Sequence, residues 1–251
     1  ERVRINKLYI KQPKRKICKN CNLKLGKAVF KSFGVSYAIC KRCCHLNGMQ
    51  LETKKFLNNF YSENKGKNYY KNYSNQFNQR VKNIYVPKVN FLKQVINEKI
   101  NLLDIGSGAG HFLKACEIKN IKAIGFEPSK LMAKIAESKL TKNKIINITL
   151  DEIHDKIASS KENVLALIGV LEHLEHPTRL LESFKKSKIK YLYLSLPLFS
   201  LSSLIENSFP RVFPRHLSGA HTHLYTYESI MYFTTKFNFN WIQSLQFMQT
   251  F

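Results

Sequence analysis

The 251-residue sequence lacks any apolar run long enough to cross a membrane. No uncharged stretch is longer than Tyr191 to Ile205, which contains Pro197 and four serines and falls short of the roughly 20 apolar residues that a span requires. The first residues also lack the pattern of a signal peptide, because lysines and arginines recur before any apolar run develops. We therefore predict no membrane span and a cytoplasmic location, where a reducing environment suits the six cysteines.

Acidic residues are scarce. The chain has 17 aspartates and glutamates against 41 lysines and arginines, a formal net charge of +24. The first 100 residues hold 23 basic and 4 acidic side chains, a net +19, whereas the rest hold 18 and 13, a net +5. Basic surfaces bind phosphate polymers and other anions, but the abundance of Lys, Asn and Ile is equally typical of a compositional bias of the genome. The charge alone leaves both interpretations open.

Composition and patterning divide the chain into three predicted domains. A hydrophobic content of 44% excludes disorder as a global description. Residues 1–50 hold five of the six cysteines and have too little apolar periodicity to fold by burial alone, which predicts a zinc-binding module. Residues 51–98 are expected to form a helical, Tyr-rich connector or lid, whose aromatic side chains either pack on a neighbouring domain or stack on bases. Residues 99–251 are the third domain.

The third domain shows short apolar runs that alternate with amphipathic segments, a pattern typical of βαβ units. The predicted fold is α/β: a doubly wound, Rossmann-like, mostly parallel sheet. Strands are expected at 101–105, 122–127, 145–149, 164–169 and 190–196, and helices at 109–119, 129–140 and 177–186. Ser129 is an expected N-cap and Pro177 an expected first helical residue. A loop is predicted at 206–224, a short helix from near Thr226, and the start of a last antiparallel strand pair at 241–251.

Four cysteines have the spacing of a metal site. Two residues separate Cys18 from Cys21 and Cys40 from Cys43, and 18 residues lie between the two pairs. Such knuckles can present four thiolates to one tetrahedral Zn²⁺, and a site filled by four protein ligands is structural rather than catalytic. Cys44 is an alternative to Cys43 as the fourth ligand, and free or redox-active thiols are the alternative to zinc.

An apolar strand from Leu102 runs into three glycines, Gly106, Gly108 and Gly110, and then into a predicted helix. Glycines let the backbone approach a ligand closely, and a helix N-terminus offers unpaired N–H groups, so a nucleotide site is predicted. The dinucleotide fingerprint also follows a first strand. This segment differs from the dinucleotide fingerprint in two ways. His111 stands at the position of the fingerprint's third glycine, and the fingerprint does not require an acid at the position of Asp104.

The acid-x-Gly-x-Gly-x-Gly segment that begins at Asp104 resembles the first motif of class I S-adenosylmethionine-dependent methyltransferases. Three further stretches agree with that family in order and spacing: 124–129, 170–177 and 194–197. The resemblance implies that Asp104 holds the ammonium group of the cofactor's methionine, that the Gly106–Gly110 backbone passes alongside, and that Glu127 accepts hydrogen bonds from the ribose hydroxyls. The other cofactor-binding candidates are Ser107, Pro128, Leu171 and Glu172. A capping or turn acid at Asp104 and a solvated loop carboxylate at Glu127 are the alternatives.

Cysteine knuckles, a Tyr-rich connector and this core together resemble bacterial enzymes that methylate sugars for surface polysaccharides or glycosylated natural products. The resemblance implies methyl transfer to carbon or oxygen of a small anionic acceptor such as a nucleotide-linked sugar. Histidine suits removal of the acceptor's proton near neutral pH, and the candidates are His173 or His223, with His216 and His221 behind them. An RNA methyltransferase and a non-catalytic cofactor-binding scaffold are the competing functions. Arg211 and Arg215 are either a diphosphate clamp or solvated charges, and the sequence leaves the oligomeric state open.

Overall fold

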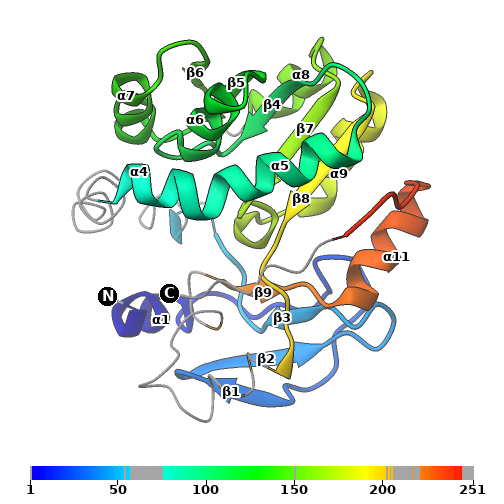
Figure 1. Ribbon diagram of the computed structural model, residues 1–251. Helices are drawn as coiled ribbons and strands as arrows, with labels where there is room; N and C mark the ends of the chain where they lie inside the picture. The colour runs from blue at the N-terminus through cyan, green and yellow to red at the C-terminus, as the bar shows by residue number, and fades with distance from the viewer. Residues whose placement is uncertain are drawn as a thin grey trace. The chain divides into compact units, whose positions relative to one another are not determined.

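The computed structural model of the chain describes residues 2–53, 55–56, 76–149, 151–201, 203, 205, 217 and 221–244. The chain divides into two compact units, both visible in Figure 1. The cysteine unit consists of Glu1–Phe60, Gly169–Leu181 and Leu196–Asn240, and the sheet unit of Tyr61–Ile168, Glu182–Ser195 and Trp241–Phe251. Two segments from the C-terminal half of the sequence therefore join the cysteine-rich N-terminus in one unit.

The sheet unit contains five parallel strands in the order β6-β5-β4-β7-β8. Their bounds are β4 Asn101–Ile105, β5 Lys122–Glu127, β6 Lys144–Asn147, β7 Val164–Ile168 and β8 Tyr191–Ser195. The central strands β4 and β7 are almost wholly buried, and β7 is entirely apolar, as is typical of strands covered on both faces. The predicted doubly wound α/β fold is confirmed. The third predicted strand is shorter than expected and ends at Asn147.

Helices connect and cover these strands. The helical segments of the sheet unit before β8 are α4 Phe77–Arg80, a π-helical turn Val81–Tyr85, α5 Val86–Val95, α6 His111–Ile118, α7 Lys130–Lys139 and α8 Ile153–Ala158. The Ser129 hydroxyl accepts the Met132 N–H and caps α7, as predicted. Helix α9 spans Pro177–Lys186, so Pro177 is its first residue. Helices α5 and α6 contact each other and share one hydrophobic core with β4 and β7.

The cysteine unit has an antiparallel sheet in the order β1-β2-β3-β9. Its strands are β1 Phe30–Ser32, β2 Val35–Ile39, β3 Leu46–Gly48 and β9 His223–Leu224. The unit also contains α1 Arg2–Tyr9, a 3-10 turn Leu171–His173 and α11 Tyr227–Phe237, which starts after Thr226 as predicted and is stabilised there by a capping box with Ser229. The prediction of a loop over 206–224 is wrong at its end, because His223 and Leu224 pair with β3.

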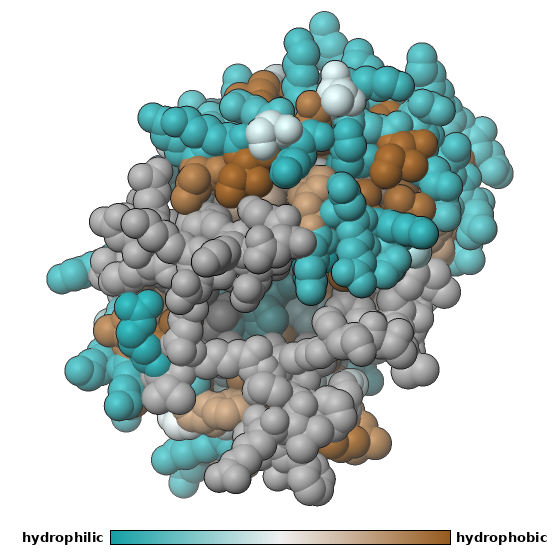
Figure 2. Space-filling model, turned by 60° about the vertical axis from the view of Figure 1, so that its left-hand side comes forward, coloured by the Kyte–Doolittle hydropathy of each residue, from teal (hydrophilic) through white to brown (hydrophobic). Residues whose placement is uncertain are grey.

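No helix among the described residues is long and apolar enough to cross a membrane. On the face in Figure 2, hydrophilic side chains dominate the described surface, with smaller hydrophobic patches between them. Several predictions fall on residues outside the described ranges. They concern the tyrosines of the connector (Tyr61, Tyr69, Tyr70 and Tyr73), the loop residues Arg211, Arg215 and His216, and the last strand pair beyond residue 244.

Candidate functional site

The glycine-rich turn follows β4, the central strand of the parallel sheet. Gly106, Gly108 and Gly110 have φ angles of 69°, 54° and 81°, a left-handed region that favours glycine because it has no Cβ atom. The chain runs from β4 to β5 on one side and later to β7 on the other, so this turn lies at the topological switch point of the sheet. In open α/β sheets, ligands bind beyond the carboxyl ends of the strands at this point.

Close packing holds the turn in place. The N–H groups of Gly106 and Ser107 donate to the Phe126 carbonyl of β5, at 2.8 and 3.3 Å. A Cβ atom on Gly110 would lie 2.8 Å from Ala136 Cβ, and one on Gly125 would lie 2.4 Å from Ser107 Oγ. A Cβ atom on Gly108, by contrast, would have no described atom within 4 Å apart from its own chain neighbours. The backbone at Gly108 is therefore open to a ligand.

Asp104 is the penultimate residue of β4, and its side chain is 1% exposed. Neither carboxylate oxygen has a hydrogen-bond partner among the described residues, and the Ser107 hydroxyl donates instead to the Asp104 backbone carbonyl at 2.9 Å. Burial, together with the charge of Glu127, raises the pKa of Asp104 to about 8. Within the described part of the chain the carboxyl group caps no helix and lacks the partner that a buried acid requires.

Glu127 ends the neighbouring strand β5 and is also buried. Its Oε2 accepts the Gly108 N–H and its Oε1 accepts the Ser129 N–H, each at 2.8 Å. Burial raises its pKa, although the two N–H donors oppose this shift. The alternative of a solvated loop carboxylate is wrong, because the backbone fixes both oxygens beside the glycine turn.

The remaining predicted cofactor residues differ in their surroundings. Ser107 is buried in the turn, and Pro128 is exposed after β5, where its carbonyl accepts a hydrogen bond from Asn147. Leu171 and Glu172 are buried in the 3-10 turn that belongs to the cysteine unit.

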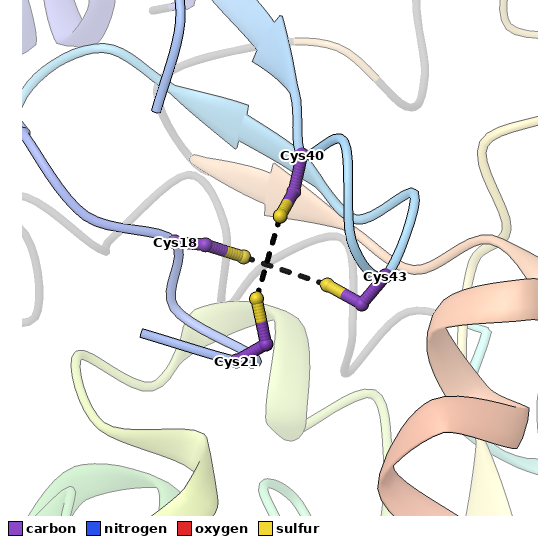
Figure 3. Close-up of side chains that lie close together, drawn as sticks. All are labelled: Cys18, Cys21, Cys40 and Cys43. Carbon is purple, nitrogen blue, oxygen red and sulfur yellow. Dashed lines mark hydrogen bonds between the residues drawn. The ribbon is translucent and has the colours of Figure 1, made fainter. Parts of the chain in front are cut away.

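Four buried sulfur atoms converge in the cysteine unit (Figure 3). Cys18 Sγ lies 3.6 Å from Cys43 Sγ, Cys21 Sγ lies 3.3 Å from Cys40 Sγ, and all four are within 4.8 Å of one another. Thiolates at 2.3 Å from a tetrahedral Zn²⁺ are separated by about 3.8 Å. The four cysteines therefore have the arrangement that such an ion requires.

The two knuckles share one backbone geometry, and this geometry decides between Cys43 and Cys44. Asn22 and Cys44 each stand four residues after the first cysteine of a knuckle, have φ angles of 60° and 54°, and donate their N–H to that cysteine's carbonyl at 3.0 and 2.9 Å. Cys44 is the turn residue equivalent to Asn22, and it is only half-buried. The fourth sulfur of the cluster belongs to Cys43.

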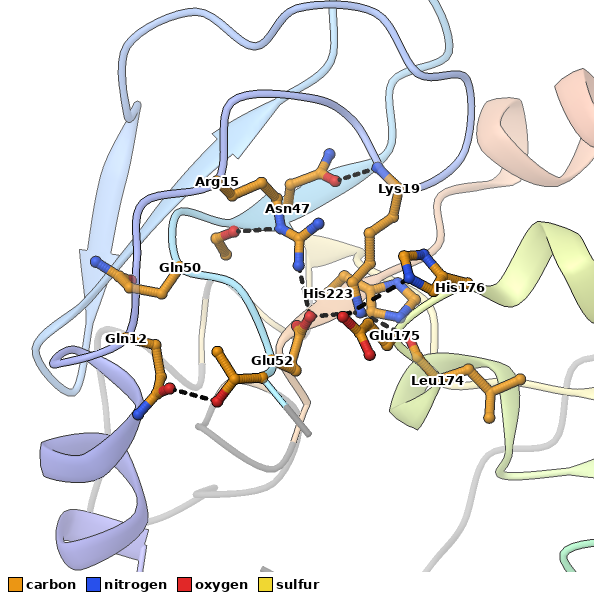
Figure 4. A network of polar contacts seen from close by, with 12 residues as sticks. Gln12, Arg15, Lys19, Asn47, Gln50, Glu52, Leu174, Glu175, His176 and His223 are labelled. Atoms are coloured by element: carbon orange, nitrogen blue, oxygen red, sulfur yellow. Dashed lines mark hydrogen bonds and ion pairs between the residues drawn. The ribbon is translucent and has the colours of Figure 1, made fainter. Parts of the chain in front are cut away.

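A buried ion network in the same unit includes Lys19, the residue that follows Cys18 (Figure 4). Glu52 Oε2 is 2.5 Å from Arg15 Nη2 and 3.0 Å from Lys19 Nζ, and Lys19 also donates to the Leu174 carbonyl at 2.6 Å. Burial lowers the pKa of Lys19 to about 8, while Glu52 counteracts this shift. Since Leu174 directly follows His173, the network fixes the backbone of the turn that carries this predicted catalytic histidine.

His223, the other predicted proton acceptor, is fully buried in β9. Its Nδ1 lies 2.9 Å from Nε2 of His45, whose Nδ1 is 3.4 Å from Ser229 Oγ. Burial and the positive charge of Lys19 lower the pKa of His45 to about 3 and that of His223 well below its ordinary range. Both imidazoles are therefore neutral at pH 7, and His223 is a weak base.

His173 lies in a different setting. Its ring centroid is 4.9 Å from that of His221, and both side chains are half-buried. With the Glu172 carboxylate they form a group whose ligand atoms are all within 4.8 Å of one another. The structure thus brings together three residues that the sequence analysis had connected only through the resemblance. The sequence analysis missed His45 and Glu52, because their partners are up to 184 residues away and no local pattern indicates them.

Comparisons with known proteins agree with this geometry. A family model described as "Methyltransferase domain" matches residues 77–244. A solved S-adenosylmethionine-dependent methyltransferase from Archaeoglobus fulgidus is similar at 23% identity and a TM-score of 0.50, over 67% of this chain and 73% of that one. The magnesium protoporphyrin IX methyltransferase from Synechocystis PCC 6803 with bound SAH is similar at 14% identity and a TM-score of 0.52, over 74% and 89%. No curated protein sequence matches the chain.

Proposed function

The chain belongs to the S-adenosylmethionine-dependent methyltransferase family, and from this premise we propose that it methylates carbon or oxygen of a small anionic acceptor, a nucleotide-linked or surface-polysaccharide sugar. The observation that carries the proposal is the buried Asp104 carboxylate, unpartnered among the described residues, at the glycine turn. The net +19 of the first 100 residues supports an anionic acceptor. The acceptor's identity rests on the resemblance found in the sequence.

The residues around the turn suit S-adenosylmethionine, which when bound supplies an electrophilic methyl group on a sulfonium. Asp104 would hold the ammonium group of its methionine, which gives the buried carboxylate a charged donor. Glu127, already oriented by two backbone N–H groups, has further lone pairs for the ribose hydroxyls. The open backbone at Gly108 would lie alongside the cofactor.

His173 is the better placed of the two proton acceptors predicted from the sequence. It is half-buried on a turn held by the Lys19–Leu174 hydrogen bond, whereas His223 is fully buried and already bonded to His45. His173 would remove the proton of the acceptor's hydroxyl or acidic C–H as the methyl group is transferred. His223 would act by positioning the neighbouring side chains of the cysteine unit.

The four-cysteine cluster would bind a structural Zn²⁺. Its support is the near-tetrahedral spacing of four buried sulfurs, together with the hydrogen bond to Cys43 that lowers the pKa of the Cys18 thiol. Four protein ligands leave no position for a substrate, so the ion would stabilise the unit and take no part in methyl transfer.

The proposal is tested by a methyl-transfer assay against a panel of nucleotide sugars, with crude RNA as a parallel acceptor. We expect transfer to a sugar nucleotide, and a loss of about 100-fold or more in kcat for His173→Ala, while the exposed His176→Ala retains activity. Transfer to RNA alone, with affinity that falls steeply as salt rises, would establish the competing RNA methyltransferase function. Cofactor binding in calorimetry without transfer to any acceptor would instead favour the non-catalytic scaffold, and absence of cofactor binding would refute the enzyme proposal itself.

A further inference from the structure

The cysteine unit holds a second group of potential metal ligands, apart from the four cysteines. Glu172 and His173 come from the 3-10 turn after β7, and His221 comes from the segment just before β9. The 3-10 turn and β9 contact each other, which brings residues almost 50 positions apart in the sequence to one place. One oxygen and two imidazole nitrogens lie within 4.8 Å of one another, a spacing that small side-chain rotations can reduce to the distances of a coordinated ion.

Glu172 gives an independent reason to expect a ligand there. Its side chain is 2% exposed, and Oε2 has no hydrogen-bond partner among the described residues. Gly169 lies in the left-handed region with a φ of 69°. Because it has no side chain, it leaves space beside Glu172 Oε1, and a Cβ atom on Gly169 would lie 3.6 Å from that oxygen. An ionised carboxylate in this buried position is costly without a positive partner. Nε2 of His223 is also buried and unpartnered in the described part of the unit, so the surroundings are polar but incompletely bonded.

We propose that Glu172, His173 and His221 bind a divalent first-row transition-metal cation, distinct from the ion of the four cysteines. Two imidazoles and one carboxylate form the ligand set typical of zinc and iron(II) sites that keep open positions, whereas four thiolates close their site. The cation supplies the positive countercharge that the buried Glu172 carboxylate requires. Anionic oxygens of an acceptor can occupy the open positions.

Cation binding should inhibit the proposed methyl transfer, an expectation that rests on the proposed function. The imidazole lone pair of His173 can bind either a metal or a proton. Occupancy of the site therefore excludes His173 as the proton acceptor, and we expect methyl transfer to decrease as the site fills and to recover when a chelator removes the cation.

The binding itself is tested without any acceptor. The 251-residue chain is loaded with one equivalent of Zn²⁺ at the cysteines and titrated with Co²⁺, while visible absorption and calorimetry are recorded. We expect a further equivalent of Co²⁺ with weak d–d bands and no thiolate-to-cobalt charge transfer. Glu172→Gln and His221→Ala should each weaken this second binding by at least about 10-fold. The exposed His176→Ala is the matched control and should leave it unchanged.

The first equivalent serves as a folding control, because a variant that keeps its cysteine-bound Zn²⁺ still has a folded cysteine unit. Absence of a second equivalent in the wild type, or equal binding in His221→Ala and wild type, would overturn the proposed site. These results do not depend on turnover. A chain that binds the second cation but transfers no methyl group would leave the site intact and refute the proposed function alone.

Discussion

Replacement of Asp104 by Asn should stabilise the cofactor-free protein and at the same time impair it as an enzyme. The amide has nearly the same shape as the carboxylic acid and carries no charge at any pH. In the wild type the carboxyl is 1% exposed and has no hydrogen-bond partner among the described residues. An ionised group in that position destabilises the folded state unless a cation joins it.

The size of the effect follows from the pKa. An aspartate in the unfolded chain has a pKa of 3.8, whereas the pKa of Asp104 in the folded protein is about 8, so the folded state holds its proton to higher pH. The contribution of Asp104 to stability is therefore fully present below pH 3.8 and is lost as the pH rises to about 8. About four pKa units at ~1.4 kcal/mol each give a ceiling of roughly 6 kcal/mol. Because water entry and relaxation reduce this cost, we expect Asp104→Asn to gain a few kcal/mol at pH 8.

Cofactor binding should show the opposite dependence on pH. Below about pH 8 the ammonium of S-adenosylmethionine must displace the proton of Asp104, so each pH unit below 8 should weaken binding by up to about tenfold. Calorimetry in two buffers of different ionisation enthalpy measures the proton released. Loss of the charged acceptor in Asp104→Asn should weaken binding by about 10- to 100-fold and remove this dependence.

The stability prediction is tested by urea denaturation of cofactor-free wild type and Asp104→Asn from pH 4.5 to 8.5. The control is Asp155→Asn, a substitution at an exposed residue of the same unit. A variant Asp104→Asn that is less stable than the wild type at pH 8 would refute the account of an uncompensated buried carboxylate. Unchanged cofactor affinity in that variant would refute the assigned partner, the ammonium group.

Three further predictions concern single positions. Cys43→Ser should lose the zinc equivalent and unfold the cysteine unit, whereas Cys44→Ser should keep the zinc and the folded unit. Metal analysis and circular dichroism distinguish the two variants, and equal zinc loss in both would contradict the ligand assignment. Glu127→Gln should weaken S-adenosylmethionine binding by about 10-fold in calorimetry, since a charged acceptor is lost, and wild-type affinity would count against contact with the ribose. Gly125→Ala should lower the free energy of unfolding by about 1–3 kcal/mol in denaturation experiments, because its Cβ would lie 2.4 Å from a neighbouring oxygen. Gly26→Ala, with nothing within 4 Å, should have little effect, and a similar cost at both positions would contradict this explanation.

Local signals predicted much of the parallel sheet. The strands 101–105 and 122–127 agree with β4 and β5, and Ser129 caps α7, because apolar runs, glycines and capping hydroxyls act on neighbouring residues. Burial also ruled out the solvated alternative for Glu127, which sequence spacing had left open. The loop expected over 206–224 was wrong at β9, since two residues become a strand only when a distant edge, here β3, is present to pair with them.

The sequence by itself determined the family: an acid and three glycines after a buried strand, a second acid one strand later, and two cysteine pairs are short-range patterns that the chain carries in any context. Tertiary structure decided which groups act together. Cys43 rather than Cys44 joins the cluster because the knuckle turns at Cys44, and His223 is a poor base because it is buried against His45. It also placed His221 next to Glu172 and His173. Burial and the proximity of residues far apart in sequence set the pKa values and the partners of these groups, and neither exists before the chain folds.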